Sequence, residues 1–293
     1  MKKNTLKDKC ALKFGFQGLS GAYHEKAANL FIDRNKIKGV ELVSCNVFEE
    51  IFEKVENGEF EYGIVAVENS LMGSIYKNFD LLQKHNLKVI GEVYVHVKHQ
   101  VYAIPGTKVK DVRELISQMP SILQCEHNIK KDFPNIKVTE YFDSVASSKL
   151  VSEKKDKSVV AISPEGAGEQ FGLIRLKKDF NDDMNNYTRF FIIHKDYIKL
   201  NTNEKKVNYK TSILFYGGNV AGFLFKALGC FSLRDINLSK IESRPIPKSP
   251  WNYYFYLDFE GKYNDEKVVN AINNLKEYAS EVKILGSYIA DKI

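Results

Sequence analysis

The chain lacks the sequence features of several protein classes. No apolar run approaches the roughly 20 residues that span a bilayer, and the amino-terminal stretch MKKNTLKDKC has no apolar segment of the kind found in a signal peptide. Four cysteines are spread over 293 residues without a CxxC pair, which argues against a disulfide framework and a structural zinc site. We therefore expect a cytoplasmic protein with no membrane contact.

Charge of either sign is not concentrated along the chain. The formal net charge is +6, but no basic arm or stripe carries it. The tyrosines from Tyr253 to Tyr263 are not interleaved with a basic groove pattern, so nucleic acid is not an expected partner. The mild positive excess suits a small anionic molecule. The histidines are scattered, and His96 and His99 fall on opposite faces of a predicted strand, so no metal site is expected.

The first two-thirds of the chain alternates short apolar segments with helical ones. Gly63 to Val67 is an unbroken apolar run, as expected of a strand buried in a parallel sheet. Such alternation predicts an α/β fold with mostly parallel sheets. The long apolar segment from Val93 to Ile104 could cross between two lobes and leave a cleft between them. Other predicted strands cover residues 12–16, 40–44, 137–142 and 158–162, and predicted helices include residues 22–31 and 47–55.

The pattern changes after Ile193. Residues 196–209 are polar and rich in lysine, which predicts a linker. From Lys210 onward the predicted elements follow the order βαββαβ, a ferredoxin-like unit. Within it, residues 253–260 alternate between two kinds of side chain, as in an antiparallel strand with one buried face.

Polar groups follow several predicted strands. Glu68, Asn69 and Ser70 come directly after an apolar strand, and ligands in open α/β sheets gather beyond the carboxyl ends of strands. A helix cap is the alternative. The turn from Gly18 to Gly21 presents free N–H groups that suit an anion, although a turn without a ligand has the same pattern. Ser144 opens a predicted helix and could cap it or bind a ligand.

The segment from Asn186 to Phe190 is the most informative. The Thr188 hydroxyl and the Arg189 guanidinium stand between an amide and an aromatic ring, and an apolar strand follows. Polar groups beside a buried strand predict a site at a strand end. In the alternative interpretation, Arg189 forms a salt bridge with a nearby aspartate, Asp182 or Asp183.

These segments together resemble the prephenate dehydratase family over almost the whole chain. The glycine turn, the Glu68-Asn69-Ser70 segment and the Asn186–Phe190 segment resemble its catalytic motifs, and residues 237–245 and 285–288 resemble those of an ACT regulatory domain. The closely similar arogenate dehydratases share all of these motifs. The chain departs from the family pattern at His24 (usually Ser or Thr), Ala66 (Pro), Gln118-Met119 (His-Pro) and Ala221–Leu224 (Pro-Gly-Ala-Leu).

The resemblance implies a fold and a domain organisation. A two-lobed catalytic domain like a periplasmic binding protein is expected at residues 10–196, and an ACT domain at residues 210–293. The two lobes are expected to comprise about residues 10–90 with 170–196, and residues 91–169. Members of such families are expected to be homodimers or homotetramers that need no cofactor or metal.

The resemblance also implies the chemistry. A carbon–oxygen lyase would convert prephenate to phenylpyruvate, with loss of carbon dioxide and water, in phenylalanine biosynthesis. Thr188 would contact the departing hydroxyl, Arg189 would bind a carboxylate with its planar fork, and Glu68 would be a cap or an acid. The residues expected to bind and orient the substrate are Gly21, Ala22, Tyr23, Asn69, Ser70, Ser144, Asn186 and Phe190.

Regulation by phenylalanine is implied as well. In the alternative interpretation of these residues, Glu242 and Arg244 only pair with each other and do not contact an effector. Two other functions are weighed: an arogenate dehydratase with the same mechanism, and an amino-acid-sensing protein without turnover. The intact Thr188 and Arg189 favour an enzyme. The residues expected to bind the effector are Gly222, Phe223, Leu224, Glu242, Ser243 and Arg244.

Overall fold

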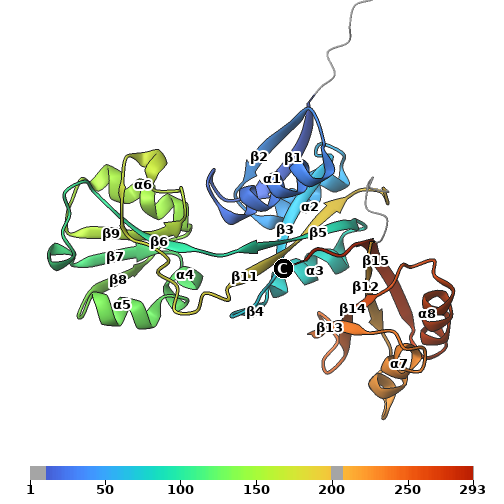
Figure 1. The fold of residues 1–293 in the computed structure, drawn as a ribbon. Helices are drawn as coiled ribbons and strands as arrows, with labels where there is room; N and C mark the ends of the chain where they lie inside the picture. The colour runs from blue at the N-terminus through green and yellow to red at the C-terminus, as the bar shows by residue number, and fades with distance from the viewer. Residues whose placement is uncertain (1–10, 199–206, 293) are drawn as a thin grey trace, which may run out of the picture.

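A computed structural model describes residues 11–198 and 207–292 of the chain. The predicted start of the catalytic domain at residue 10 and most of the predicted linker, residues 199–206, lie outside the described residues. Figure 1 shows two α/β lobes joined by long strands, with a third unit packed beside the first lobe. No helix within the described ranges is both long and apolar enough to cross a membrane.

The first lobe is built on a six-stranded mixed sheet in the order β2-β1-β3-β11-β5, with the short β4 beside β3. Helix α1 packs on one face of this sheet, and α2 and α3 pack on the other. The elements are β1 (Leu12–Gln17), α1 (Tyr23–Asn35), β2 (Val40–Cys45), α2 (Phe48–Glu56), β3 (Tyr62–Asn69), β4 (Gly73–Ser74), α3 (Tyr76–Lys84), β5 (Lys88–His96) and β11 (Tyr187–His194).

The second lobe has a five-stranded sheet in the order β10-β6-β9-β7-β8. Strands β7, β8 and β9 are parallel, whereas β6 and β10 are antiparallel to their neighbours. The elements are β6 (His99–Ala103), η1 (Val109–Asp111), β7 (Glu114–Ser117), α4 (Met119–Leu123), α5 (Glu126–Asp132), β8 (Lys137–Glu140), α6 (Ser144–Lys154), β9 (Val159–Pro164), η2 (Glu169–Phe171) and β10 (Ile174–Lys177).

The lobe boundaries differ from the predicted ones. Strand β5 stays in the first sheet as far as His96, and the second sheet begins at His99, so the predicted boundary near residue 90 is too early. The predicted return near residue 170 is too early as well, because β10 still pairs with β6. An apolar run carries no mark of the point at which it leaves one sheet for the next.

The third unit is an antiparallel four-stranded sheet in the order β13-β14-β12-β15, with two helices on one face. This is the ferredoxin-like βαββαβ arrangement. Its elements are β12 (Tyr209–Tyr216), α7 (Phe223–Ser232), β13 (Leu238–Pro245), β14 (Tyr253–Glu260), α8 (Glu266–Tyr278) and β15 (Glu281–Ile289).

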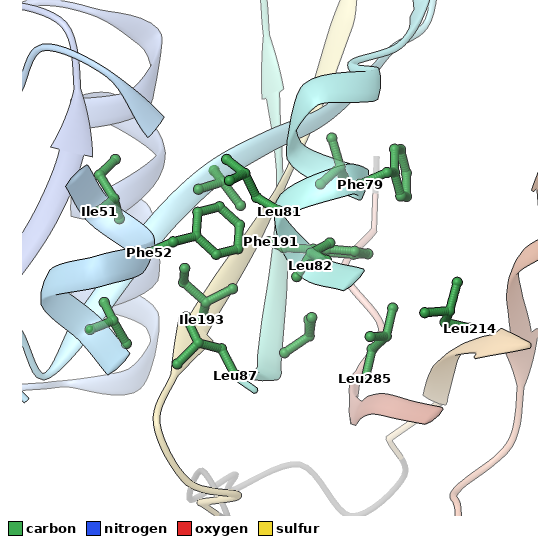
Figure 2. Close-up of a cluster of buried hydrophobic side chains, with 14 of the residues drawn as sticks. Ile51, Phe52, Phe79, Leu81, Leu82, Leu87, Phe191, Ile193, Leu214 and Leu285 are labelled. Atoms are coloured by element: carbon green, nitrogen blue, oxygen red, sulfur yellow. The ribbon is translucent and has the colours of Figure 1, made fainter. Parts of the chain in front are cut away.

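One hydrophobic core joins the third unit to the first lobe. Leu214 and Leu285 of the third unit lie near Leu82 of α3 (Figure 2), and all three belong to the same buried cluster. Gly286 marks the closest approach, since a Cβ atom there would lie 1.9 Å from the Val89 carbonyl oxygen. The free face of the carboxy-terminal sheet is thus covered by the first lobe.

Candidate active site

A cavity of about 430 Å³ is lined by residues from both lobes. The first lobe contributes the start of α1, the ends of β3 and β11, and the loop after β2. The second lobe contributes the starts of α4 and α6. Six of the residues expected to act on or bind substrate line it: Ala22, Tyr23, Asn69, Ser144, Thr188 and Phe190.

Strand β11 presents alternate residues to its two faces. Thr188 and Phe190 line the cavity, and Phe190 and Ile192 pack beneath it against α1. Phe191 and Ile193 lie in the core on the other face. Because successive side chains of a strand point in opposite directions, Thr188 and Arg189 cannot serve the same pocket.

A β-bulge in β3 places the Asn69 side chain beside Thr188. Thr188 pairs with Asn69 and Arg189 with Glu68, but Phe190 pairs with Ala66, so Val67 is the extra residue. Ala66 and Asn69 both line the cavity although they are three residues apart. A bulge of this kind re-aims the side chains that follow it, and here it brings the Asn69 amide to the Thr188 hydroxyl.

A chain of hydrogen bonds connects Thr188 to the second lobe. The Asn69 Nδ2 donates to Thr188 Oγ1 at 3.1 Å and to Asn186 Oδ1 at 2.7 Å. Asn186 Nδ2 in turn donates to Gln124 Oε1 at 2.8 Å, and His99 Nε2 lies 2.7 Å from the same oxygen. Since Thr188 accepts from Asn69 and donates to no described residue, its hydroxyl proton is available to a ligand in the cavity.

The two histidines of the cavity are neutral. Burial lowers the pKa of His24 to about 4 and that of His99 to about 4. His99 must carry its proton on Nε2 to donate to Gln124, which leaves Nδ1 as an acceptor without a partner among the described residues. The His24 ring packs edge-on against Phe190 at 5.0 Å between centroids. The cavity wall near Thr188 is therefore polar but uncharged.

The start of α1 offers hydrogen-bond donors to the cavity. The Ala22 N-cap has no side-chain hydrogen bond, and the first intrahelical bond runs from Lys26 N to Ala22 O. The N–H groups of Tyr23 and His24 therefore have no helical acceptor. Glu25 accepts from Gly21 N at 2.6 Å and holds the turn in place. A helix start of this kind attracts a carboxylate.

The predicted role of Arg189 in carboxylate binding is contradicted by its position. Its side chain is 4% exposed and lies on the face of β11 away from the cavity. It donates to Glu92 at 2.7 Å, to Asp258 of β14 and to the Tyr288 hydroxyl. The predicted alternative, an ion pair with Asp182 or Asp183, is also wrong. We call Arg189, Glu92, Asp258 and Lys210 the buried ion cluster.

Glu68 is likewise outside the cavity. It bonds Lys240 of β13 at 2.9 Å and lies 3.8 Å from Arg189, so it faces the third unit with the buried ion cluster. The expectation of a catalytic acid there is contradicted. Both Glu68 and Arg189 were grouped with their neighbours in sequence, although strand geometry places neighbours on opposite faces.

Three other expected binding residues, Asn186, Ser70 and Gly21, do not line the cavity. Asn186 is fully buried behind the cavity as a link in the hydrogen-bond chain. Ser70 Oγ donates to Asn185 O and accepts from Tyr187 N, which fixes the start of β11. Gly21 borders a neighbouring hollow. Ser144 lines the cavity, but the helix cap beside it is Asp143, whose Oδ1 accepts from Ala146 N at 2.8 Å.

The cavity residues that were not singled out as site residues from the sequence include Gln124, His99 and Asp143. Gln124 lies at the end of the short helix α4 and belongs to no recognisable sequence motif. His99 was considered only as a metal ligand. Asp143 was passed over for its neighbour Ser144, although Asp is an equally favoured N-cap residue that precedes a helix. No group of three or more metal-ligating side chains occurs among the residues that the structure describes.

The expected effector residues divide into two groups. Phe223 and Leu224 line a hollow of about 120 Å³ in the third unit, and Gly222 is the N-cap of α7 next to it. Glu242 and Arg244 instead contact the first lobe at Ser74 and Asp80, so the alternative in which they pair with each other is wrong. Ser243, between them on β13, points to solvent.

Comparison with known proteins gives one consistent result. The family model described as prephenate dehydratase matches residues 14–197. An Arabidopsis thaliana protein, arogenate dehydratase/prephenate dehydratase 2, is 36% identical over 289 residues, which is 96% of this chain and 73% of that protein.

Two solved structures share the fold over the whole length. A prephenate dehydratase from Arthrobacter aurescens in complex with L-Phe has a TM-score of 0.83 at 25% identity and covers 95% of this chain and 90% of its own. GqqA, described as a novel type of quorum quenching acylase, has a TM-score of 0.80 at 28% identity and covers 95% of this chain and 98% of its own.

The relatives contradict the expected localisation. The Arabidopsis thaliana relative named above is chloroplastic, and so are others of the same species. The cytoplasmic assignment rested only on the lack of a signal peptide and a membrane span, and neither feature bears on import into a plastid.

The family match covers well over half of the chain, and the curated relatives extend it through the carboxy-terminal unit. The chain therefore belongs to the prephenate dehydratase family, and it is a hydro-lyase.

Proposed function

We propose that the cavity between the lobes is the active site in which prephenate loses carbon dioxide and water to give phenylpyruvate. The observation that carries this proposal is the Thr188 side chain, which lines the cavity and whose hydroxyl oxygen accepts from Asn69. A hydroxyl held in this way donates a hydrogen bond to the oxygen that leaves the ring.

The reaction needs few groups because the product is aromatic. As the ring carboxylate leaves as carbon dioxide, its bonding electrons enter the ring and expel the hydroxyl, which takes up one proton and departs as water. Thr188 stabilises the charge that develops on the departing oxygen, with the proton reaching it from water. Apolar side chains such as Phe190 and Val97 leave the ring carboxylate poorly solvated, which favours its loss.

The remaining carboxylate needs another partner because Arg189 is absent from the cavity. The free N–H groups at the start of α1 supply it. Gln124, fixed by Asn186 and His99, holds the second lobe against the first at this point. Substrate binding and lobe alignment thus depend on the same hydrogen-bond chain.

Arogenate is a second candidate substrate, favoured by the names of the curated relatives. Its ring is the same, and an amino group replaces the keto group of the side chain. The catalytic groups of the cavity act on the ring, so the proposed chemistry applies to both molecules.

The carboxy-terminal unit is proposed to be an ACT domain that binds phenylalanine and inhibits the enzyme. The L-Phe complex of the Arthrobacter aurescens protein supports this proposal. The hollow beside Phe223 and Leu224 is the candidate effector site. The Phe223 ring packs onto Phe215 and Phe255 and lies over Gly217, where a Cβ atom would meet it at 2.1 Å. An assembly of two or four subunits is part of this proposal.

An assay of aromatic product tests the function. Protein purified from a host without its own dehydratase is incubated with prephenate or arogenate, and phenylpyruvate or phenylalanine is measured with and without added phenylalanine. We expect turnover on at least one substrate and inhibition by phenylalanine at micromolar to millimolar concentration, a coupling of about 1–3 kcal/mol. Lack of turnover on both substrates would contradict the proposed function, and a flat phenylalanine titration would contradict the regulatory part alone.

A further inference from the structure

Asp143 is an acidic residue in the wall of a cavity that must bind a dicarboxylate. It lies at the start of α6 and is 7% exposed. One oxygen, Oδ1, accepts from Ala146 N at 2.8 Å and caps the helix. No lysine, arginine or histidine of the described residues lies within ion-pair distance of the carboxylate. A helix cap alone does not require this charge, because serine or asparagine caps equally well.

The second oxygen of Asp143 faces the other lobe across the cleft. A Cβ atom built on Gly18 would lie 3.1 Å from Asp143 Oδ2 and 3.4 Å from the Ala22 Cβ. Asp143 Oδ2 and the N-cap of α1 thus both border Gly18 of the glycine turn. Ala22 also packs against Val145 in a small buried cluster. The first residues of α1 and Asp143 thus line the same cavity from its two lobes.

The charge of Asp143 has no counterpart in the cavity wall. Lys77 is the one cationic side chain among the described lining residues, and it pairs with Glu49 at 2.8 Å. Burial raises the pKa of Asp143, as expected of a carboxylate without a cation nearby. A bound cation would compensate this charge, whereas a keto oxygen, which only accepts hydrogen bonds, would be repelled by it.

We propose, building on the dehydratase function above, that Asp143 determines substrate specificity by binding the side-chain ammonium of the 2-amino acid substrate, arogenate. An α-amino acid carries an ammonium and a carboxylate on one carbon atom. The pairing of Asp143 with the start of α1 matches that arrangement: the carboxylate of Asp143 binds the ammonium, and the α1 N–H groups bind the carboxylate. The keto acid, prephenate, matches only the second half.

Replacing Asp143 with asparagine tests the negative charge apart from the helix cap, because the charge is lost and the cap is kept. Asp143→Asn keeps the shape and an oxygen for Ala146 N, and Asp143→Ser is a second uncharged cap. Asp156→Asn is the matched control, because Asp156 lies in the same lobe, accepts from Ser158 N at 2.8 Å and does not line the cavity. Each protein is assayed on arogenate and prephenate, and its thermal melting curve is recorded.

We expect kcat/KM for arogenate to fall roughly 10- to 100-fold in both Asp143 variants, the range for loss of a charge-assisted hydrogen bond. The kcat/KM for prephenate should stay the same or rise in these variants. The control, Asp156→Asn, should match the wild type on both substrates. Asp143→Glu should restore part of the preference for arogenate.

The remaining outcomes overturn the inference. An equal loss on both substrates, with normal melting, would place Asp143 in the ring chemistry; an unchanged ratio would leave it a helix cap. Wild-type protein that acts on prephenate alone would refute the specificity role but keep the proposed function. Wild-type protein inactive on both would refute the proposed function itself.

Discussion

The two faces of strand β11 differ in chemistry although they share one backbone. On the cavity face, Thr188 accepts from the Asn69 amide, which is linked through Asn186 and Gln124 to the neutral imidazole of His99. On the opposite face, Arg189 lies in the buried ion cluster, where Asp258 and Glu92 accept from its guanidinium. The first face has a donor available for a ligand, and the second has its donors already occupied. Adjacent residues of one segment thus have separate surroundings, the cavity for Thr188 and the carboxy-terminal unit for Arg189.

The buried ion cluster ties strand β11 to the carboxy-terminal unit. Burial opposes the charge of Arg189, but Asp258, Tyr288 and Glu92 raise its pKa well above the usual value. Lys210 of β12 adds a second link to Glu92 at 2.9 Å. A shift of the carboxy-terminal sheet would therefore pull directly on the residue next to Thr188. This is a physical route by which an effector bound to that unit could alter the cavity.

Loss of the Thr188 hydroxyl should have the largest effect on activity and little effect on the fold. Thr188→Val keeps the shape of the side chain, and we expect kcat to fall about 10²- to 10⁴-fold, the range for a positioned proton donor or hydrogen-bond donor. Thr188→Ser, which keeps the hydroxyl, is the control. Steady-state assays on both substrates check the result. Turnover of Thr188→Val within a factor of three of the wild type would remove this hydroxyl from the mechanism.

A substitution on the opposite face of the strand should lower the stability of the fold rather than act on the chemistry. Arg189→Met leaves Glu92 and Asp258 buried without their partner, which typically costs about 3–5 kcal/mol. Urea unfolding measures this change, and Arg175→Met, which removes a surface ion pair, should cost less than about 1 kcal/mol. A stable Arg189→Met protein with abolished turnover would show that Arg189 serves the chemistry and would break the comparison between the faces.

Much of the architecture followed from the sequence because it depends on local pattern. Apolar runs bounded by turns predicted the α/β lobes, and period-two alternation predicted the strand Tyr253–Glu260 of the βαββαβ unit. Asn69 was expected at the carboxyl end of a strand on the same grounds, and it ends β3 at 3.1 Å from the Thr188 hydroxyl.

The wrong predictions concern features that depend on tertiary structure. The bulge at Val67 puts Asn69, rather than Glu68, on the same face as Ala66, and no local signal marks it. The partners of Arg189 come from β5 and from the third unit, 97 and 69 residues away. Alternation along β11 alone would nevertheless have separated Arg189 from Thr188. The acidic wall of the cavity at Asp143 became visible only when the two lobes were brought together.

The neutral imidazoles of the cavity face should make stability depend on pH, whereas Arg189 stays charged throughout. The pKa of His99 is about 4 in the fold, against about 6.5 in an unfolded chain. Between these values the unfolded state binds the extra proton, so the free energy of unfolding must fall as the pH is lowered from 6.5 towards 4. The loss should reach about 1–3 kcal/mol for this residue.

The contribution of His99 can be isolated with a variant that does not titrate. His99→Gln retains a side-chain donor for Gln124. Urea unfolding of both proteins at intervals from pH 7 to pH 4.5 gives two curves, and the wild-type curve should fall more steeply below pH 6.5. Parallel curves would mean that His99 takes up its proton in the folded protein, and the wall beside Thr188 would then carry a charge like the opposite face of the strand.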